Sequence, residues 1–546
     1  MATPQNISMI DVTITLHGID PTKPDMEQLE PLLRQYIHRL LTDLNIPAQH
    51  DISVKKSSKK APSSRALEAI SINGKQCRIP YTPERFDAAN AKELASCIID
   101  IILLNRELLV DPYLSQRICE RVVSISNSQL KSLPPAEFQN LVTTMVKRGF
   151  KLKRCEKSMD AVDTSDWNYM NYFDFLIGDA ASTSVRVWFN KEYLELYGQA
   201  AETQDNRFNE MYSMMRDGLF YELGIVYPEV SWEVDEELDS NEFRFQFNDV
   251  HYPSIFGLKP GEYLVDDTVD RLTLLKVKGT KVYNPANGTE CAVIDESDLG
   301  TCDDAGLTTW DPLGYCILYL SHRLRIQAGS FLIRDLVVNE LESLKQSYPV
   351  LVNTTAKSYD IFMLVWILRD LLDEGISIRD MRSILDNLLT VNGYTNADFG
   401  QFIVLSPEGT HLVPHCSGDM DGLTFSDYAG YLRARALKMY ISHKYSRGQK
   451  SMIVYLLDPA IEEKIAGMKN GLSKKEHKQI CDAIHREVGN LPPTAHNPVI
   501  LTTIEIRRRF KKFIEIEFPY LDVLSHQELV HDMNIQPIAK ISLEEK

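Results

Sequence analysis

Hydrophobic and polar residues alternate near the start of the chain. In residues 9–18, MIDVTITLHG, the side chains of Val12, Ile14 and Leu16 fall on one face, which is the pattern of a half-buried strand. Between about residues 26 and 44, apolar residues recur at helical spacing instead. The start of the chain therefore predicts a strand followed by a helix.

The following segments continue this mixed pattern. Residues 66–81, ALEAISINGKQCRIPY, predict a β-hairpin, because Asn73 and Gly74 suit the two positive φ angles of a type I′ turn. Helices are predicted over about residues 91–124 and 135–148. A strand pair, FDFLIGD and SVRVWF, is then predicted to end near residue 189.

The pattern restarts in the same order after this point. A helix, a proline turn and a strand are predicted both by LLRQYIHRLLTDLNIPAQHDISV and by NEMYSMMRDGLFYELGIVYPEVSWEV. Three residues of the first segment correspond to three of the second: Arg34 to Arg216, Leu44 to Leu223 and Pro47 to Pro228. These matches favour an internal duplication in which residues 7–180 are a shortened copy of the chain from about residue 185 onward. The alternative is coincidence, because strand–helix–strand–strand units are common and short matches arise easily.

The rest of the chain predicts three further regions. Residues 251–309, rich in glycine, aspartate and threonine, predict a β-rich region. Helices are predicted over residues 310–352 with a break near 327–330, and then over 359–374, 377–388 and 425–446. From residue 451 the order is βαβαβ, which predicts a small mixed sheet.

These segments together predict a mixed α/β, α+β multidomain fold. A chain of 546 residues is too long for one core. The formal net charge of −17 disfavours nucleic acid and anionic membrane surfaces as the main partners.

No apolar run reaches the roughly 18 residues that a membrane-spanning helix needs. The two strongest candidates, CIIDIILL and IFMLVWIL, are expected to be buried faces of core helices. The first twelve residues lack the features of a signal peptide, and the nine cysteines form no CxxC pair. These features predict a soluble cytoplasmic chain with reduced thiols.

Few residues suggest catalytic or metal chemistry. His411, His415 and Cys416 have zinc-binding side chains, but their spacing lacks a second pair, so a loop is expected there. Ser525, which lies close to a histidine and an acid in LSHQE, is better explained as a helix cap completed by Glu528. We expect no enzyme activity, no cofactor and no metal, and an enzyme that uses a cleft between subdomains remains the least favoured hypothesis.

The basic run RRRFKK, residues 507–512, is flanked by acidic residues. On a helix its charges cannot share one face, which favours an ion-paired helix surface. The alternatives are a protein-docking face, in which Arg508 is a candidate contact, and a nucleic-acid contact.

Residues 371–388, LLDEGISIRDMRSILDNL, predict a tight helix–turn–helix. Gly375 suits the position after the first helix. Ser377 is expected to cap the second helix, with Asp380 returning the hydrogen bond.

The second helix of this segment is predicted to be amphipathic. Its buried stripe is expected to contain Ile378, Met381, Ile384, Leu385 and Leu388. The outward side chains are then Arg379, Arg382 and Asp386. From the pattern alone, a solvated charged face is the alternative to a docking face.

Residues 368–388 resemble a signature of the cytoplasmic domain of the export-gate family of type III secretion and flagellar export. This is the FHIPEP family, whose secretion member is SctV. Three other stretches resemble the family in the same order: LFYELGIVYPEVSW with LDSNEFRFQFNDV, SYPVLV, and the closing NPVILTTIEIRRRFKKFIEIEFPYLDVLSHQELVHDMNI. The resemblance covers about residues 185–541.

The resemblance implies a domain built from several subdomains. Residues 183–250 with 310–349 would form a first α/β subdomain, residues 251–309 an inserted β-rich one, residues 350–447 a helical winged-helix-like one and residues 448–546 a closing α/β one. Residues 1–180 would form a soluble α/β region in the place where family members carry a membrane half. Direct membrane insertion is therefore not expected.

The resemblance also implies a function without chemistry. Family members form rings that receive chaperone–substrate complexes and gatekeeper proteins beneath the export gate. The leading hypothesis is a non-enzymatic, self-associating docking platform in the cytoplasm, recruited to the inner-membrane secretion apparatus. The alternative is a cytosolic adaptor that kept the fold and lost the secretion role.

The resemblance, together with the outward charges, suggests an interface. Family rings close between the first α/β subdomain of one copy and the helical subdomain of the next. The expected contact residues are Arg379, Asp380 and Arg382, with the acidic stretch 234–240 as the opposing surface. That stretch holds Asp235, Glu236 and Glu237.

Overall fold

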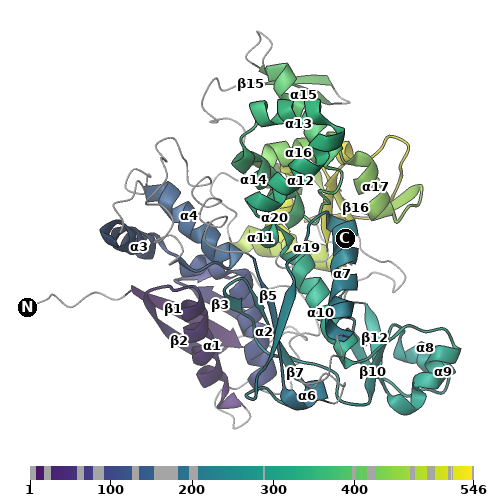
Figure 1. Ribbon diagram of the computed structural model, residues 1–546. Coiled ribbons are helices and arrows are strands. Elements are labelled where there is room, and N and C mark those ends of the chain that lie inside the picture. The colour runs from purple at the N-terminus through teal and green to yellow at the C-terminus, as the bar shows by residue number, and fades with distance from the viewer. Residues whose placement is uncertain are drawn as a thin grey trace, which may run out of the picture. The chain divides into compact units, whose positions relative to one another are not determined.

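The computed structural model describes residues 8–16, 26–57, 67–77, 91–125, 135–152, 183–195, 207–286, 289–395, 401–406, 409–414, 425–467, 474–488, 499–514, 518 and 521–543. The chain divides into two compact units, coloured along the sequence in Figure 1. Unit 1 comprises Met1–Cys77, Arg85–Val337 and Leu372–Arg379. Unit 2 comprises Arg78–Glu84, Val338–Leu371 and Asp380–Lys546.

Unit 1 begins with a four-stranded sheet in the order β2-β1-β3-β4. Its elements are β1 (Ser8–Leu16), α1 (Leu29–Asp43), β2 (Ala48–Lys56), β3 (Leu67–Ile72) and β4 (Lys75–Gln76). Strand β2 is parallel to β1, whereas β3 is antiparallel to it. Val12, Ile14 and Leu16 are fully buried, which confirms the predicted strand face. Asn73 and Gly74 both have positive φ, 52° and 72°, as the predicted turn requires.

Helices follow this first sheet. They are α2 (Ala91–Leu104), the 3-10 helix η2 (Arg106–Leu109), α3 (Pro112–Ile125) and α4 (Pro135–Arg148). The helical segment expected over about 91–124 comprises α2, η2 and α3, and the helix expected over 135–148 is α4. The predicted strand FDFLIGD lies outside the described residues.

A second sheet in unit 1 has the order β6-β5-β7-β8, with β9 also paired to β7. Its elements are β5 (Val185–Phe189), α6 (Lys191–Glu195), α7 (Arg207–Leu223), β6 (Val230–Val234), β7 (Glu242–Phe247), β8 (Val250–His251) and β9 (Ile255–Phe256). Phe243, Phe245 and Phe247 alternate on β7 and form the buried face. The central strand again has a parallel neighbour on one side and an antiparallel one on the other.

A smaller antiparallel sheet, with the order β11-β12-β10-β13, comes next in the chain. Its elements are β10 (Glu262–Val265), α8 (Val269–Leu274), β11 (Thr280–Tyr283), β12 (Glu290–Asp295), η5 (Glu296–Asp298), α9 (Leu299–Asp304) and β13 (Thr309–Trp310). The chain then forms α10 (Pro312–Ile326) and α11 (Ala328–Phe331). The break between them at Gln327 lies where the sequence predicts it.

Unit 2 is helical in its first part. Helix α12 (Arg334–Ser347) enters it, and α13 (Pro349–Ser358), α14 (Ile361–Asp373), α15 (Met381–Thr395), α16 (Phe425–Arg435) and α17 (Lys438–Ser446) come after it in the chain. Between α15 and α16 lies a hairpin of β14 (Gln401–Ser406) and β15 (Gly409–Pro414). The prediction of a loop around His411 is therefore wrong for residues 409–414, because these residues form β15 and pair with β14. His415 and Cys416 lie outside the described residues.

Unit 2 ends in a parallel sheet with the order β18-β17-β16-β19. Its elements are β16 (Ser451–Leu457), α18 (Pro459–Ala466), α19 (Lys474–Val488), β17 (Val499–Thr502), α20 (Ile504–Ile514), β18 (Asp522–Ser525), η6 (His526–Glu528) and β19 (Asn534–Ile541). The predicted mixed sheet is wrong. Helices return the chain before β17 and β18, and β19 joins the far side of β16, so all four strands run the same way.

None of the described helices combines the length and the apolar character needed to cross a membrane. The run CIIDIILL lies in α2, where Ile98, Ile99, Ile101 and Ile102 are buried. The run IFMLVWIL lies in α14, where Leu364, Val365, Ile367 and Leu368 are likewise buried. Both runs are core helices, as predicted.

Candidate interaction surface

The segment from Gly375 to Asp380 forms neither helix nor strand, and α15 begins after it. Gly375 has φ +67°, which fits the predicted position just after a helix. The backbone N–H of Ile378 donates to the carbonyl of Leu223, at the end of α7, over 2.9 Å. This hydrogen bond holds the segment to α7, so the helix starts only at Met381.

The predicted N-cap of this helix, Ser377, is wrong, and the observed N-cap lies three residues later. Ser377 accepts a hydrogen bond from the N–H of Arg379 at 3.2 Å, which is outside the helix. The Asp380 carboxylate accepts from the N–H of Ser383 at 3.1 Å, so Asp380 is the N-cap. One carboxylate oxygen of this proposed contact residue is therefore occupied by capping.

The buried and exposed faces of this segment agree with the sequence pattern. Ile378, Met381, Ile384, Leu385 and Leu388 are all buried. Arg379, Asp380, Arg382 and Asp386 are all exposed.

Each of the two outward arginines lies over an exposed tyrosine. In unit 1, the Arg379 guanidinium lies 4.8 Å from the ring centroid of Tyr221, whose side chain is 63% exposed. In unit 2, the Arg382 guanidinium lies 5.6 Å from the ring centroid of Tyr348, which is 42% exposed. Arginine and tyrosine are enriched at the energetic centres of protein interfaces, so these two pairs fit a docking role better than isolated charges do.

The acidic stretch 234–240 is partly used within unit 1. Asp235 bonds the Arg244 guanidinium at 2.5 Å, and Asp239 bonds Lys92 at 2.6 Å. Burial, and then the nearby Arg39 cation, lower the pKa of Arg244. Glu236 and Glu237 are exposed and remain the outward members of the stretch.

Arg508 is engaged inside unit 2. Its guanidinium forms a two-pronged ion pair with the Asp370 carboxylate of α14. The same run of basic residues places Arg507 in the core beside Glu528 and Lys511 near Asp522. The predicted ion pairing of residues 507–512 is confirmed, except that Arg507 is buried rather than at the surface.

The sequence predicts only one of the roles of Glu528, the helix cap. Its carboxylate accepts the Ser525 N–H at 2.7 Å, as the capping hypothesis predicts. It also pairs with Arg433 of α16 and with Arg507 of α20, and all three side chains are almost completely buried. The glutamate in LSHQE is therefore an anchor between elements and not a catalytic acid.

The described residues contain no cluster of histidine, cysteine and acidic side chains able to hold a metal ion. Burial raises the pKa of the Cys77 thiol to about 12, and burial with Asp266 does the same for Cys291. These two thiols stay protonated at neutral pH and are unsuited to nucleophilic catalysis.

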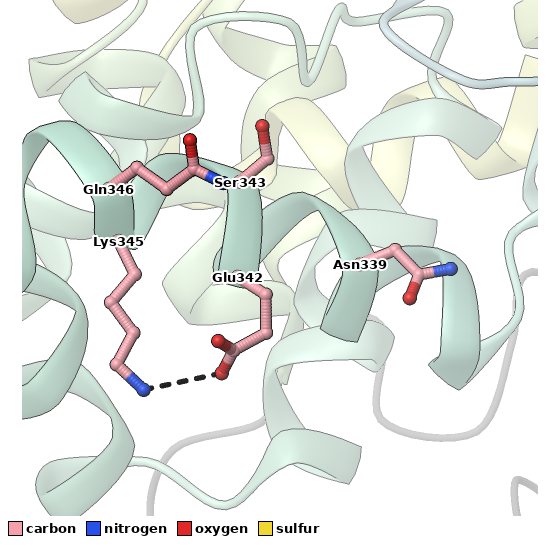
Figure 2. Close-up of a pocket in the computed structure, with 5 residues that line it drawn as sticks. All are labelled: Asn339, Glu342, Ser343, Lys345 and Gln346. Carbon is pink, nitrogen blue, oxygen red and sulfur yellow. Dashed lines mark hydrogen bonds and ion pairs between the residues drawn. The ribbon is translucent and has the colours of Figure 1, made fainter.

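One open hollow of about 470 Å³ lies along α12. Figure 2 shows its five lining residues, all from this one helix: Asn339, Glu342, Ser343, Lys345 and Gln346. Lys345 and Glu342 bond each other at 3.3 Å. The hollow is polar and open, and its lining residues do not form a catalytic arrangement.

The model of the FHIPEP family matches residues 130–403 and 426–534, which is more than half of the chain. The chain therefore belongs to the FHIPEP family. Its mixed α/β multidomain fold is similar to that of a solved structure, described below. The matched ranges contain the Arg379 and Arg382 segment, the acidic stretch and Arg508.

Two curated relatives show the extent of the similarity. The chain is 28% identical over 352 residues to "Low calcium response locus protein D" of Yersinia pestis, covering 61% of this chain and 45% of that protein. It is 24% identical over 347 residues to "Flagellar biosynthesis protein FlhA" of Bacillus subtilis, covering 60% and 46%. The chain thus spans about half the length of the curated relatives it matches.

Among solved structures, the Chlamydia pneumoniae CdsV protein is similar, with a TM-score of 0.56 and 27% identity. The match covers 66% of this chain and 99% of that chain. A second structure, of the CdsV and CdsO protein complex, matches with a TM-score of 0.56 and 26% identity, covering 67% and 100%.

Proposed function

We propose that this protein is a non-enzymatic component of a type III secretion or flagellar export apparatus. The carrying observation is the family match, which runs through both units and includes the candidate interaction surface. Relatives named for secretion and for flagellar biosynthesis support the same class.

Within this class, its role is a docking platform that associates with itself. The support is chemical: Arg379 over Tyr221 and Arg382 over Tyr348 are exposed cation–aromatic pairs, and Glu236 and Glu237 provide exposed opposite charge. Asp235, Asp380 and Arg508 remain proposed contact residues, and each also has an intramolecular partner. We also propose the subdomain boundaries that the family resemblance implies.

The proposed partners are further copies of the chain and export cargo with its chaperones or gatekeepers. A CdsO-like protein is a further candidate, because the similar CdsV protein has a solved complex with CdsO. The proposed location is the cytoplasmic side of the inner-membrane apparatus.

The test is a double charge reversal, Arg379→Glu with Arg382→Glu, in the full chain. Sedimentation across a range of concentrations should show weaker self-association. Each reversal removes a cation–aromatic contact, and the new glutamate repels Glu236 and Glu237 of the neighbouring copy. The thermal midpoint should stay within about 2 °C, since exposed charges contribute only about 0–1 kcal/mol each to folding.

The matched control is Arg271→Glu with Lys278→Glu, which makes the same charge change at two exposed residues of the β10–β13 region. It should leave association unchanged. Equal effects of the two double variants, or no effect of the first on any association, would show that the residues are merely solvated.

A further inference from the structure

Residues 8–125, coloured purple to blue in Figure 1, precede the range that the FHIPEP family model matches, which begins at residue 130. They contain the first sheet together with α1, α2, η2 and α3. We call them the N-terminal module, and we call the rest of unit 1, from residue 130 onward, the family part. The contacts between the two indicate what the module does.

Helix α2 of the module is buried on two sides. Ile98 and Ile102 lie on one apolar side, whereas Ile99 and Leu103 lie on another, which they share at helical spacing with Lys92. A helix that is buried on two sides packs against two partners. Within the module, α2 packs against α1. The charged residues of α2 show what covers its second side.

Two charged residues of α2 pair with buried charges of the family part. The Asp100 carboxylate lies 2.6 Å from the guanidinium of Arg323, in α10. The Lys92 ammonium lies 2.8 Å from the carboxylate of Glu242, in β7, and 2.6 Å from that of Asp239. The side chain of Arg323 is 8% exposed and that of Glu242 is 1% exposed. The module therefore supplies counterions to a buried cation and a buried anion of the family part.

This charge pattern sets the direction of α2. Lys92 and Asp100 are separated along the helix axis by about 12 Å. The family part presents acids to the Lys92 end and Arg323 to the Asp100 end. The opposite direction would place each charge against a like charge, and a buried charge without a counterion is costly. The family part is therefore complementary to α2 in one direction only.

Other elements of the module add polar contacts to the same part. Asp43, at the end of α1, accepts the backbone N–H of His251 at 3.0 Å and contacts its Nδ1 at 2.9 Å. Arg106, in η2, donates to the Tyr252 hydroxyl at 3.1 Å, and both side chains are buried. The His251 ring lies 5.1 Å from the Trp188 ring. Tryptophan, tyrosine and arginine are enriched at the energetic centres of protein interfaces, so the covered surface has the composition of such an interface.

We propose that the N-terminal module is a resident protein partner of the family part. It is a separately folded module that occupies, on the same chain, a docking surface formed by Trp188, Glu242, His251, Tyr252 and Arg323. It binds through charge complementarity and keeps this surface closed to other proteins. The inference goes beyond the proposed export role and does not rest on it, because it concerns only contacts within unit 1.

The experiment uses the full chain with a specific protease site inserted between Ser128 and Gln129, outside the described residues. After cleavage, the two pieces should sediment as one complex down to nanomolar concentrations, with the circular dichroism spectrum of the uncut chain. The reason is that Arg323 and Glu242 are paired only while the module is bound.

Asp100→Asn keeps the side-chain shape and leaves Arg323 without its carboxylate, so the cleaved pieces should bind at least about a hundredfold more weakly. The matched control is Asp51→Asn, the same change at a module side chain that is 67% exposed, which should leave the affinity unchanged. Lys92→Met tests the other pair at a side chain that is 31% exposed, where the module is expected to stay folded. It should weaken binding about tenfold.

A double variant separates the charge pair from a general loss of structure. Arg323→Met combined with Asp100→Asn removes the buried cation together with its counterion. Binding should therefore recover to within about tenfold of the unaltered cleaved chain. A purely structural defect at Asp100 would not be repaired by a second substitution in the family part.

Four results would overturn the inference: pieces that separate at micromolar concentration, pieces that unfold on cleavage, Asp100→Asn and Lys92→Met binding as tightly as Asp51→Asn, or no recovery in the double variant. If the larger piece pairs with a second copy of itself in place of the module, the surface takes that copy and the inference is wrong as well.

The charge reversals at Arg379 and Arg382 distinguish this inference from the proposed function. They should leave the cleaved pieces bound to each other. Failure of the proposed self-association therefore leaves the inference standing, and separation of the pieces leaves the proposed function standing.

Discussion

At the residue scale, the backbone contact between Gly224 and Arg379 fixes where α7 meets the segment before α15. Gly224 has φ +79°, and a Cβ built on it would lie 2.4 Å from the backbone nitrogen of Arg379. That atom belongs to the main chain and cannot rotate away. The position therefore requires glycine both for its φ and for the space.

Gly224→Ala should consequently destabilise unit 1 by about 2–4 kcal/mol, from left-handed strain together with a backbone shift. Urea unfolding of the full chain measures this loss. The control Gly300→Ala, at a helical glycine of α9 with open space around it, should be neutral or slightly stabilising. A loss below about 0.5 kcal/mol at Gly224 would mean that the backbone contact is not rigid.

Residue-scale predictions from the sequence succeeded where the cause is local. Asn73 and Gly74 were predictable, because a two-residue turn with positive φ restricts the residue types directly. The cap at Asp380 was missed by three residues, because the bond between Ile378 and Leu223 delays the helix. That bond joins distant parts of the chain and cannot be recognised in the local sequence pattern.

At the scale of elements, Glu528 joins three pieces of unit 2. It lies in η6 and pairs with Arg433 from α16 and Arg507 from α20, while its carboxylate also accepts the Ser525 N–H. The sequence shows the cap, which lies three residues away, but not the two arginines. An ionised glutamate here balances two buried cations.

Glu528→Gln should destabilise unit 2 by about 3–5 kcal/mol, because the amide keeps the shape and removes the negative charge between two buried guanidinium groups. Thermal unfolding measures the loss. The same change at an exposed pair, Glu476→Gln beside Lys464, should cost no more than about 1 kcal/mol. Similar costs at the two sites would show that water reaches the Glu528 cluster.

At the scale of the whole molecule, the order of elements was largely predictable and the direction of some strands was not. The restart of the pattern near residue 185 corresponds to a second sheet with the order of the first. The closing sheet was expected to be mixed, although a βαβαβ order favours parallel strands. All its pairs are parallel, including β19 with β16. Ion pairs between residues far apart in the sequence, such as Arg508 with Asp370, were likewise not predictable from the hydrophobic and polar pattern.

The division into two compact units has a consequence for unfolding. Each unit has a buried core of its own: Ile14 is fully buried in the first sheet of unit 1, and Phe510 is fully buried in the closing core of unit 2. Units with separate cores unfold in separate cooperative transitions. Calorimetry of the full chain should therefore show at least two transitions.

Ile14→Ala should lower only the transition of unit 1, at a cost of about 2–5 kcal/mol, and Phe510→Ala only that of unit 2, at about 3–5 kcal/mol. Each loss combines the removed apolar contacts with the cavity left behind. Each variant therefore serves as the control for the other. If both substitutions lower one common transition by similar amounts, the two units unfold as a single cooperative block, and the division of the chain is geometric without being energetic.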